Sequence, residues 1–146
     1  MCLILVAWRA HAQYPLLLAA NRDEFFHRAA TPAAWWRQPD ILAGRDLAAG
    51  GTWLGVARDG RFAALTNFRD ASTPPRSAPS RGELVPATLA AALPVEQQLQ
   101  HLRATGGSYN GFNLLIGDGK QLIWYSNKGE ADPRNGQPLT PGIYGI

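Results

Sequence analysis

A chain of 146 residues fits a single domain, spanning 1–146, that is long enough to bury a sizeable core. The net charge is +3, but the basic residues are scattered, which favours solubility over nucleic-acid binding. One cysteine excludes an intramolecular disulfide and multi-cysteine zinc sites. The longest apolar runs are far shorter than a membrane-spanning helix, and no secretory signal is evident. We therefore expect a cytoplasmic protein without stable membrane insertion.

The N-terminal third begins with two apolar runs, residues 2–8 and 14–20, joined by a link short enough for a hairpin. Antiparallel pairing would bring the start of the first strand close to the end of the second. Cys2 would then meet the polar cluster Asn21-Arg22-Asp23-Glu24. A salt-bridged strand end is the ordinary interpretation of such a cluster, and a functional site is the alternative.

The middle of the chain alternates irregular segments with hairpins. Residues 25–50 predict irregular structure with at most a short strand at 41–46, and Trp35-Trp36 is expected to cover the core or a pocket rim. Residues 52–58 and 61–67 form the clearest hairpin, because Asp-Gly between two strand-like runs favours a tight turn.

The second half predicts helices and then a further hairpin. After a loop at 71–79, the spacing of Ser80 and Glu83 indicates a capping box ahead of a helix ending at Leu93; a second helix would span 95–104. Residues 112–117 and 120–126 predict a hairpin, and a strand starts at 143. The fold class is α+β, with antiparallel sheets built from hairpins and covered by two consecutive helices. A sheet that lacks later strands would expose an edge, which predicts a homodimer or poor solubility.

Cys2 offers the clearest chemistry. Met1 precedes a small residue, so removal of Met1 would give Cys2 both a thiol and an α-amine that serves as base for that thiol. Asp23 could hold the amine and Arg22 could orient a substrate oxygen. The ordinary alternative is a buried cysteine that packs as a small apolar residue.

Asn67 follows one predicted strand and Asn110 precedes another, and their side chains could donate N–H groups to an oxyanion in the Cys2 chemistry.

Other chemistries find less support in the sequence. None of the three histidines lies at a compelling strand end, no phosphate-binding glycine motif occurs, and no spacing indicates a metal site.

Several motifs, in order along almost the whole chain, resemble the NRDE family, the Transport and Golgi organisation 2 proteins. They are Met1-Cys2, Asn21-Arg22-Asp23-Glu24, Gly44-Arg45-Asp46, Gly51-Thr52-Trp53-Leu54-Gly55, Thr66-Asn67-Phe68-Arg69, Ser80-Arg81-Gly82-Glu83 and Tyr109-Asn110-Gly111-Phe112. The resemblance implies an N-terminal-nucleophile-hydrolase-like αββα sandwich that normally continues past residue 146.

The same resemblance implies roles for individual residues. Cys2 would be nucleophile and base, Asp23 the amine partner, and Asn67 and Asn110 the oxyanion or positioning residues. Arg22, adjacent to Asp23, would point to the opposite face of a strand. Five further motif residues are expected to bind substrate: Asn21, Glu24, Trp53, Phe68 and Arg69.

Three functions stay open at this point. The first is amide or acyl hydrolysis by Cys2 without a cofactor. The second is a non-enzymatic protein that binds and traffics haem or an acyl chain, with Cys2 or His27 as the iron ligand and pocket walls made by Trp35, Trp36, Trp53 and Phe68. The third is a structural or partner-binding domain.

Overall fold

The structure is a computed structural model that describes residues 2–68 and 77–146. Its strands are β1 (Leu3–Trp8), β2 (Leu16–Asn21), β3 (Ala30–Trp35), β4 (Ile41–Asp46), β5 (Leu54–Ala57), β6 (Phe62–Asn67), β7 (Phe112–Gly117), β8 (Leu122–Ser126) and β9 (Gly142–Gly145). Its helices are α1 (Leu84–Ala90) and α2 (Val95–Thr105), and short 3₁₀ turns occupy Arg81–Glu83 and Gly106–Ser108. The predicted α+β class is confirmed.

The strands form two antiparallel sheets. The larger sheet has six strands in the order β3-β4-β5-β6-β7-β8, and the smaller has three in the order β2-β1-β9. The predicted hairpins at β1–β2, β5–β6 and β7–β8 are all present. Two of them turn at glycines with positive φ, +85° at Gly60 and +80° at Gly119, a conformation that glycine adopts without steric cost.

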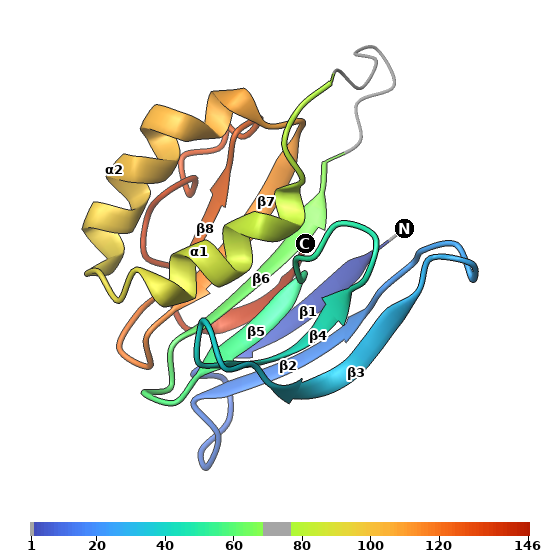
Figure 1. The fold of residues 1–146 in the computed structure, drawn as a ribbon. Coiled ribbons are helices and arrows are strands. Elements are labelled where there is room, and N and C mark those ends of the chain that lie inside the picture. The colour runs from blue at the N-terminus through green and yellow to red at the C-terminus, as the bar shows by residue number, and fades with distance from the viewer. Residues whose placement is uncertain (1, 69–76) are drawn as a thin grey trace.

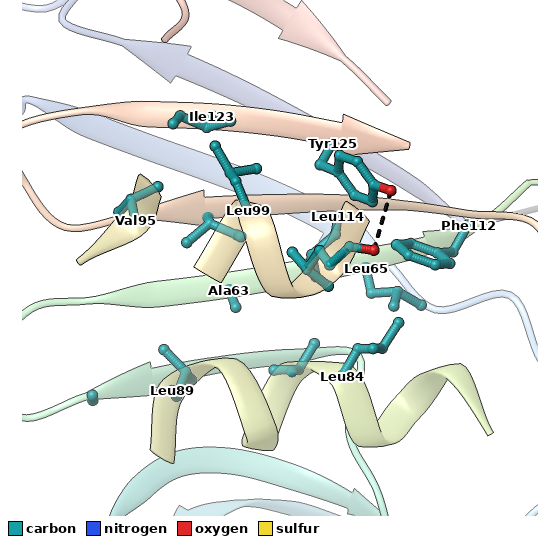
Figure 2. Packing of buried hydrophobic residues seen from close by; sticks show 14 of the residues in the cluster. Ala63, Leu65, Leu84, Leu89, Val95, Leu99, Phe112, Leu114, Ile123 and Tyr125 are labelled. Atoms are coloured by element: carbon teal, nitrogen blue, oxygen red, sulfur yellow. Dashed lines mark hydrogen bonds between the residues drawn. The ribbon is translucent and has the colours of Figure 1, made fainter. Parts of the chain in front are cut away.

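Two apolar cores hold the layers together. One lies between the larger sheet and the helices, and Figure 1 shows α1 and α2 over that face of the sheet. Figure 2 shows part of this core, where Phe112 and Leu114 pack beneath α2 and the Tyr125 hydroxyl donates to the Leu102 carbonyl at 3.3 Å. The other core lies between the two sheets. From the smaller sheet, Ile4, Val6 and Trp8 of β1 are buried in it, and Leu16 and Leu18 of β2 and Tyr144 of β9 pack against it.

The smaller sheet buries one face only. Strand alternation directs Ile4 and Val6 inward and leaves Leu3 and Leu5 on the outer face, where Leu5 is 47% exposed. Ile143 of β9 lies on the same outer face, since it pairs with Ala7, and is 77% exposed. The described residues therefore form helix, sheet and sheet layers. The homodimer expected from an exposed edge stays a prediction, which sedimentation would test.

Three local predictions were wrong. Residues 30–35 form a strand, β3, where irregular chain was expected. The first helix ends at Ala90 rather than Leu93. The capping box does not form, because the Glu83 N–H bonds to the backbone oxygen of Ser80 and the Glu83 carboxylate accepts the Tyr109 hydroxyl instead. The second helix is confirmed and runs one residue further, to Thr105. Most of the predicted loop at 71–79 lies outside the described residues.

Candidate functional site

The β1–β2 hairpin places Cys2 beside Asp23. Leu3 pairs with Asn21, so the residue before β1 lies opposite the residues that follow β2. The Asp23 N–H donates to Cys2 Sγ at 3.3 Å, and Sγ lies 3.9 Å from the Asp23 carbonyl oxygen. A backbone N–H in this position can stabilise negative charge that develops on sulfur. Met1 lies outside the described residues, so the pairing of a processed amine with the Asp23 carboxylate stays a prediction.

Arg22 lies in the same cleft, although its place next to Asp23 implied the opposite face of a strand. Strand alternation does not apply to it, because β2 ends at Asn21. Its Nη2 donates to Asp46 Oδ2 at 3.0 Å, and Arg28 Nε donates to the same oxygen at 2.7 Å. Arg28 Nε also lies 3.8 Å from a Glu24 carboxylate oxygen.

Asp46 is the centre of this ion-pair network. Its second oxygen, Oδ1, accepts the backbone N–H groups of Ala48 and Ala49 at 2.9 and 3.0 Å. Burial raises the pKa of Asp46, but the hydrogen bonds from Arg28 and the two backbone N–H groups outweigh it and lower that pKa from 3.8 to about 2. The side chain is therefore a permanent anion that fixes two guanidinium groups and the loop after β4.

The predicted residues converge on one cleft of about 420 Å³. The residues that were predicted and line it are Cys2, Arg22, Asp23, Glu24, Trp53, Asn67 and Asn110. Asn21 does not line this cleft, Phe68 lines a different cavity, and Arg69 lies outside the described residues. Seven of the residues that line the cleft were therefore predicted from the sequence.

Backbone contacts between distant segments build the opposite wall. Thr52 N–H donates to the Gly82 carbonyl at 2.9 Å, and a Cβ on Gly51 would collide with that same carbonyl. This close approach explains the glycine at position 51. Arg81 Nη1 then donates to the Gly111 carbonyl at 2.9 Å, which joins the start of α1 to the segment that carries Asn110.

Sequence analysis missed several residues of the cleft. Arg28, Arg45, Asp46 and Arg81 line it, together with Ser80. The Gly44-Arg45-Asp46 motif was a usable signal, because it carries two charges directly after an apolar segment. Arg81 also lies in a quoted motif, Ser80-Arg81-Gly82-Glu83, but its place in the cleft depends on the tertiary contact between Thr52 and Gly82.

Three of the four proposed apolar wall residues lie elsewhere. Trp36 packs against the helix-side core, and Trp35 carries the guanidinium of Arg58 over its ring at 3.9 Å; neither lines the cleft. Phe68 helps to line a second cavity of about 230 Å³ with Trp124 and Tyr144. The Cys2 cleft is therefore more polar than the sequence suggested.

Two other features are absent from residues 2–68 and 77–146. In these ranges, no cluster of three or more His, Cys, Asp or Glu side chains is arranged to hold a metal ion. No helix there is long and apolar enough to cross a membrane. His27, the other proposed haem ligand, lines a neighbouring cavity and stacks on Phe25, so it does not share a cleft with Cys2.

Comparison with known proteins gives a consistent family. The family model described as Transport and Golgi organisation 2 matches residues 1–146. A Transport and Golgi organization protein 2 homolog from Bos taurus is 42% identical over 142 residues, which cover 91% of this chain and 50% of the relative. The homolog from Homo sapiens is 41% identical over 142 residues, which again cover 91% of this chain and 50% of the relative. The Transport and Golgi organization protein 2 from Drosophila melanogaster is 40% identical over 95 residues, which cover 58% of this chain and 33% of the relative. The chain spans about half the length of the mammalian relatives, and it belongs to the Transport and Golgi organisation 2 family.

Proposed function

We propose that this protein binds a small molecule in the cleft around Cys2 and takes part in transport of the kind for which its relatives are named. The names of the relatives, which mention transport and Golgi organisation and no reaction, favour binding and trafficking over catalysis. The ligand classes are amide or acyl compounds, or haem as cargo. The observation that carries the proposal is the gathering of Cys2, Arg22, Asp23, Asn67 and Asn110 in one cleft of about 420 Å³.

A second candidate, amide or acyl hydrolysis, is favoured by the Cys2 geometry. The stacked antiparallel sheets with helices on one side support an N-terminal-nucleophile-hydrolase-like sandwich, in which the first residue of a processed chain is the nucleophile. The thiol of Cys2 lies in the cleft, and the Asp23 N–H already donates to it.

The hydrolytic steps would run as follows. After removal of Met1, the α-amine of Cys2 accepts the thiol proton and the sulfur attacks the carbonyl carbon. The carbonyl electron pair moves to oxygen, where the side-chain amides of Asn67 and Asn110 can donate hydrogen bonds. The carbon–nitrogen bond then breaks as the leaving amine takes the proton, and water hydrolyses the thioester to release the acid and restore Cys2.

One probe separates the two candidates. N-dodecanoylglycine contains both an acyl chain and an amide, so it suits both candidates. Calorimetry measures its binding, and mass spectrometry measures whether its amide bond is cleaved. Binding without cleavage supports the carrier. Cleavage to dodecanoate and glycine, lost in Cys2→Ala, supports the hydrolase. A haem titration followed by absorbance covers the remaining ligand class, and failure of both ligands to bind would refute the proposal.

The state of the N-terminus gives a further test of the hydrolase. Intact mass should report loss of Met1 and a single adduct with a thiol-directed lactone electrophile. Because the chain has one cysteine, Cys2→Ala is a complete control. A retained Met1 leaves the thiol without its base, and hydrolysis would then be excluded.

A further inference from the structure

The charges that line the Cys2 cleft are not evenly matched. Four arginines and three carboxylates line it: Arg22, Arg28, Arg45, Arg81, Asp23, Glu24 and Asp46. Asp46 pairs with both Arg22 and Arg28, and Arg28 also lies near Glu24, so these four charges balance one another. Among residues 2–68 and 77–146, the lining of the cleft thus contains one more arginine than carboxylates.

Arg45 contributes its charge in a fixed position. Its Nε donates to the Gly50 carbonyl at 3.1 Å, and its guanidinium lies over the Trp36 ring, 4.4 Å from the centroid. The Trp36 indole N–H in turn donates to the Ala43 carbonyl at 3.0 Å, which holds the ring in place. The entropy cost of ordering a long side chain is thus largely met before any ligand binds.

Among the described residues, the two Nη atoms of Arg45 have no hydrogen-bond acceptor. Within residues 2–68 and 77–146, no carboxylate lies within ion-pair distance of Arg45. The Nε edge is occupied by Gly50, so the end of the guanidinium, with its two parallel N–H groups, is the part left for a ligand. This edge matches the two oxygens of a carboxylate.

Arg81 adds a second positive charge from the other wall. It lies in the turn before α1, and its Nη1 is held by the Gly111 carbonyl at 2.9 Å. The contact between Thr52 and Gly82 keeps this turn close to the segment that follows Gly50. Arg45 and Arg81 are therefore each held by a backbone carbonyl, Gly50 for Arg45 and Gly111 for Arg81.

We propose that the ligand of this cleft carries a carboxylate, and that Arg45 binds it through an end-on, two-pronged hydrogen-bonded pair while Cys2 lies in the same cleft. The proposal deepens the proposed function by naming a chemical feature of the ligand. It rests on the cleft as the ligand site, and it holds for a carried ligand and for a hydrolysed one.

The test uses Cys2 as a reporter, because it is the only cysteine in the chain. Iodoacetyl-glycine, iodoacetyl-β-alanine and iodoacetyl-γ-aminobutyrate place a carboxylate at increasing distance from the reacting carbon, and each has a neutral primary-amide counterpart. Rates of Cys2 alkylation are measured by intact mass and divided by the rates with free cysteine. For the best-fitting length, we expect the carboxylate to react about three to ten times faster than its amide.

Variants assign that preference to Arg45. Arg45→Gln should bring the ratio close to that of free cysteine, and Arg45→Lys should retain part of it by keeping the charge. Arg58→Gln is the matched control, because Arg58 also stacks on a tryptophan, Trp35, and does not line the cleft; its ratio should not change. Circular dichroism verifies that each variant is folded.

Three results would overturn the proposal. The first is an equal rate ratio for the carboxylate and its amide at every probe length. The second is a preference for the carboxylate that survives in Arg45→Gln. The third is a preference that inorganic phosphate suppresses but acetate at equal ionic strength does not, which would assign a phosphate as the ligand group instead. Labelling of Cys2 by the neutral amides shows independently that small molecules enter the cleft. Failure of the carboxylate preference alone would therefore leave the proposed function standing, whereas failure of all labelling would refute both.

Discussion

Asp46→Asn should destabilise the protein through the ion-pair network at the cleft. The amide oxygen of asparagine can still accept the N–H groups of Ala48 and Ala49, so the substitution removes mainly the charge that Arg22 and Arg28 share. The pKa of Asp46 is about 2 against an ordinary 3.8, and each pH unit is worth about 1.4 kcal/mol, so the ionised carboxylate, with its bonds to Arg28 and to the two backbone N–H groups, contributes at most roughly 2 kcal/mol to folding. The side chains of Arg28 and Asp46 are 36% and 17% exposed, so solvent screens the pair only in part.

The pH dependence provides the sharper signature. A carboxyl whose pKa is lowered by folding gives its full stabilisation above about pH 4, and this is lost as the pH falls toward about 2. The difference between wild type and Asp46→Asn, measured by urea unfolding, should therefore be largest near neutral pH and shrink from about pH 4 to about pH 3.

Asp40→Asn is the matched control for this experiment. Asp40 pairs with Arg58 at 2.7 Å, the same distance as Asp46 with Arg28, but the two side chains are 54% and 61% exposed. An exposed pair is worth about 0–1 kcal/mol, so its loss should cost clearly less. Equal costs for the two variants, or a cost for Asp46→Asn that does not change with pH, would refute the assigned role of burial and charge.

Three further substitutions test other parts of the structure. Tyr109→Phe removes a 2.6 Å hydrogen bond to Glu83 and should cost about 1–2 kcal/mol in urea unfolding. Burial and the bond to Glu83 raise the Tyr109 pKa from 10.0 to about 12. The stabilisation that this group gives the wild type should therefore fall as the pH rises between those values. If Tyr109→Phe lost stability in the same way over this pH range, the assignment would be contradicted. Gly51→Ala places a methyl group against the Gly82 carbonyl and should cost about 1–3 kcal/mol, detectable as a lower melting temperature; an unchanged temperature would mean that the two loops separate freely. Ile4→Ala opens a cavity between the sheets and should cost about 2–5 kcal/mol by chemical denaturation, and a loss below about 1 kcal/mol would argue against that core.

The sequence predicted those parts of the fold that depend on local chemistry. Asp59-Gly60 and Asp118-Gly119 identified two hairpins correctly, because few dipeptides adopt the positive φ that these turns need. The pairing of Cys2 with the end of β2 followed from hairpin geometry alone. Both inferences use contacts between neighbouring strands, which the order of the chain already specifies.

The edge strand β3 could not be predicted in the same way. All six of its residues are exposed, so it lacks the alternation of apolar and polar residues that indicates a strand. Pro32 lies where the pairing of β3 with β4 shifts register, between Thr31 and Ala34. Proline is tolerated at an edge or a bulge because no ladder hydrogen bond is lost there, and this explains why a sequence that argues against a strand forms one.

Two departures from local rules lie beside the cleft. Strand alternation alone would turn Arg22 away from Asp23, and Glu83 was expected to cap α1, yet both side chains join separate segments that line the cleft. Arg22 ties the end of β2 to Asp46, and Glu83 ties the turn that carries Arg81 to Tyr109, the neighbour of Asn110. In each case a local preference gives way to a tertiary contact. Natural sequences often depart from local rules at functional sites, so the position of these departures supports the proposal that a ligand binds in the Cys2 cleft.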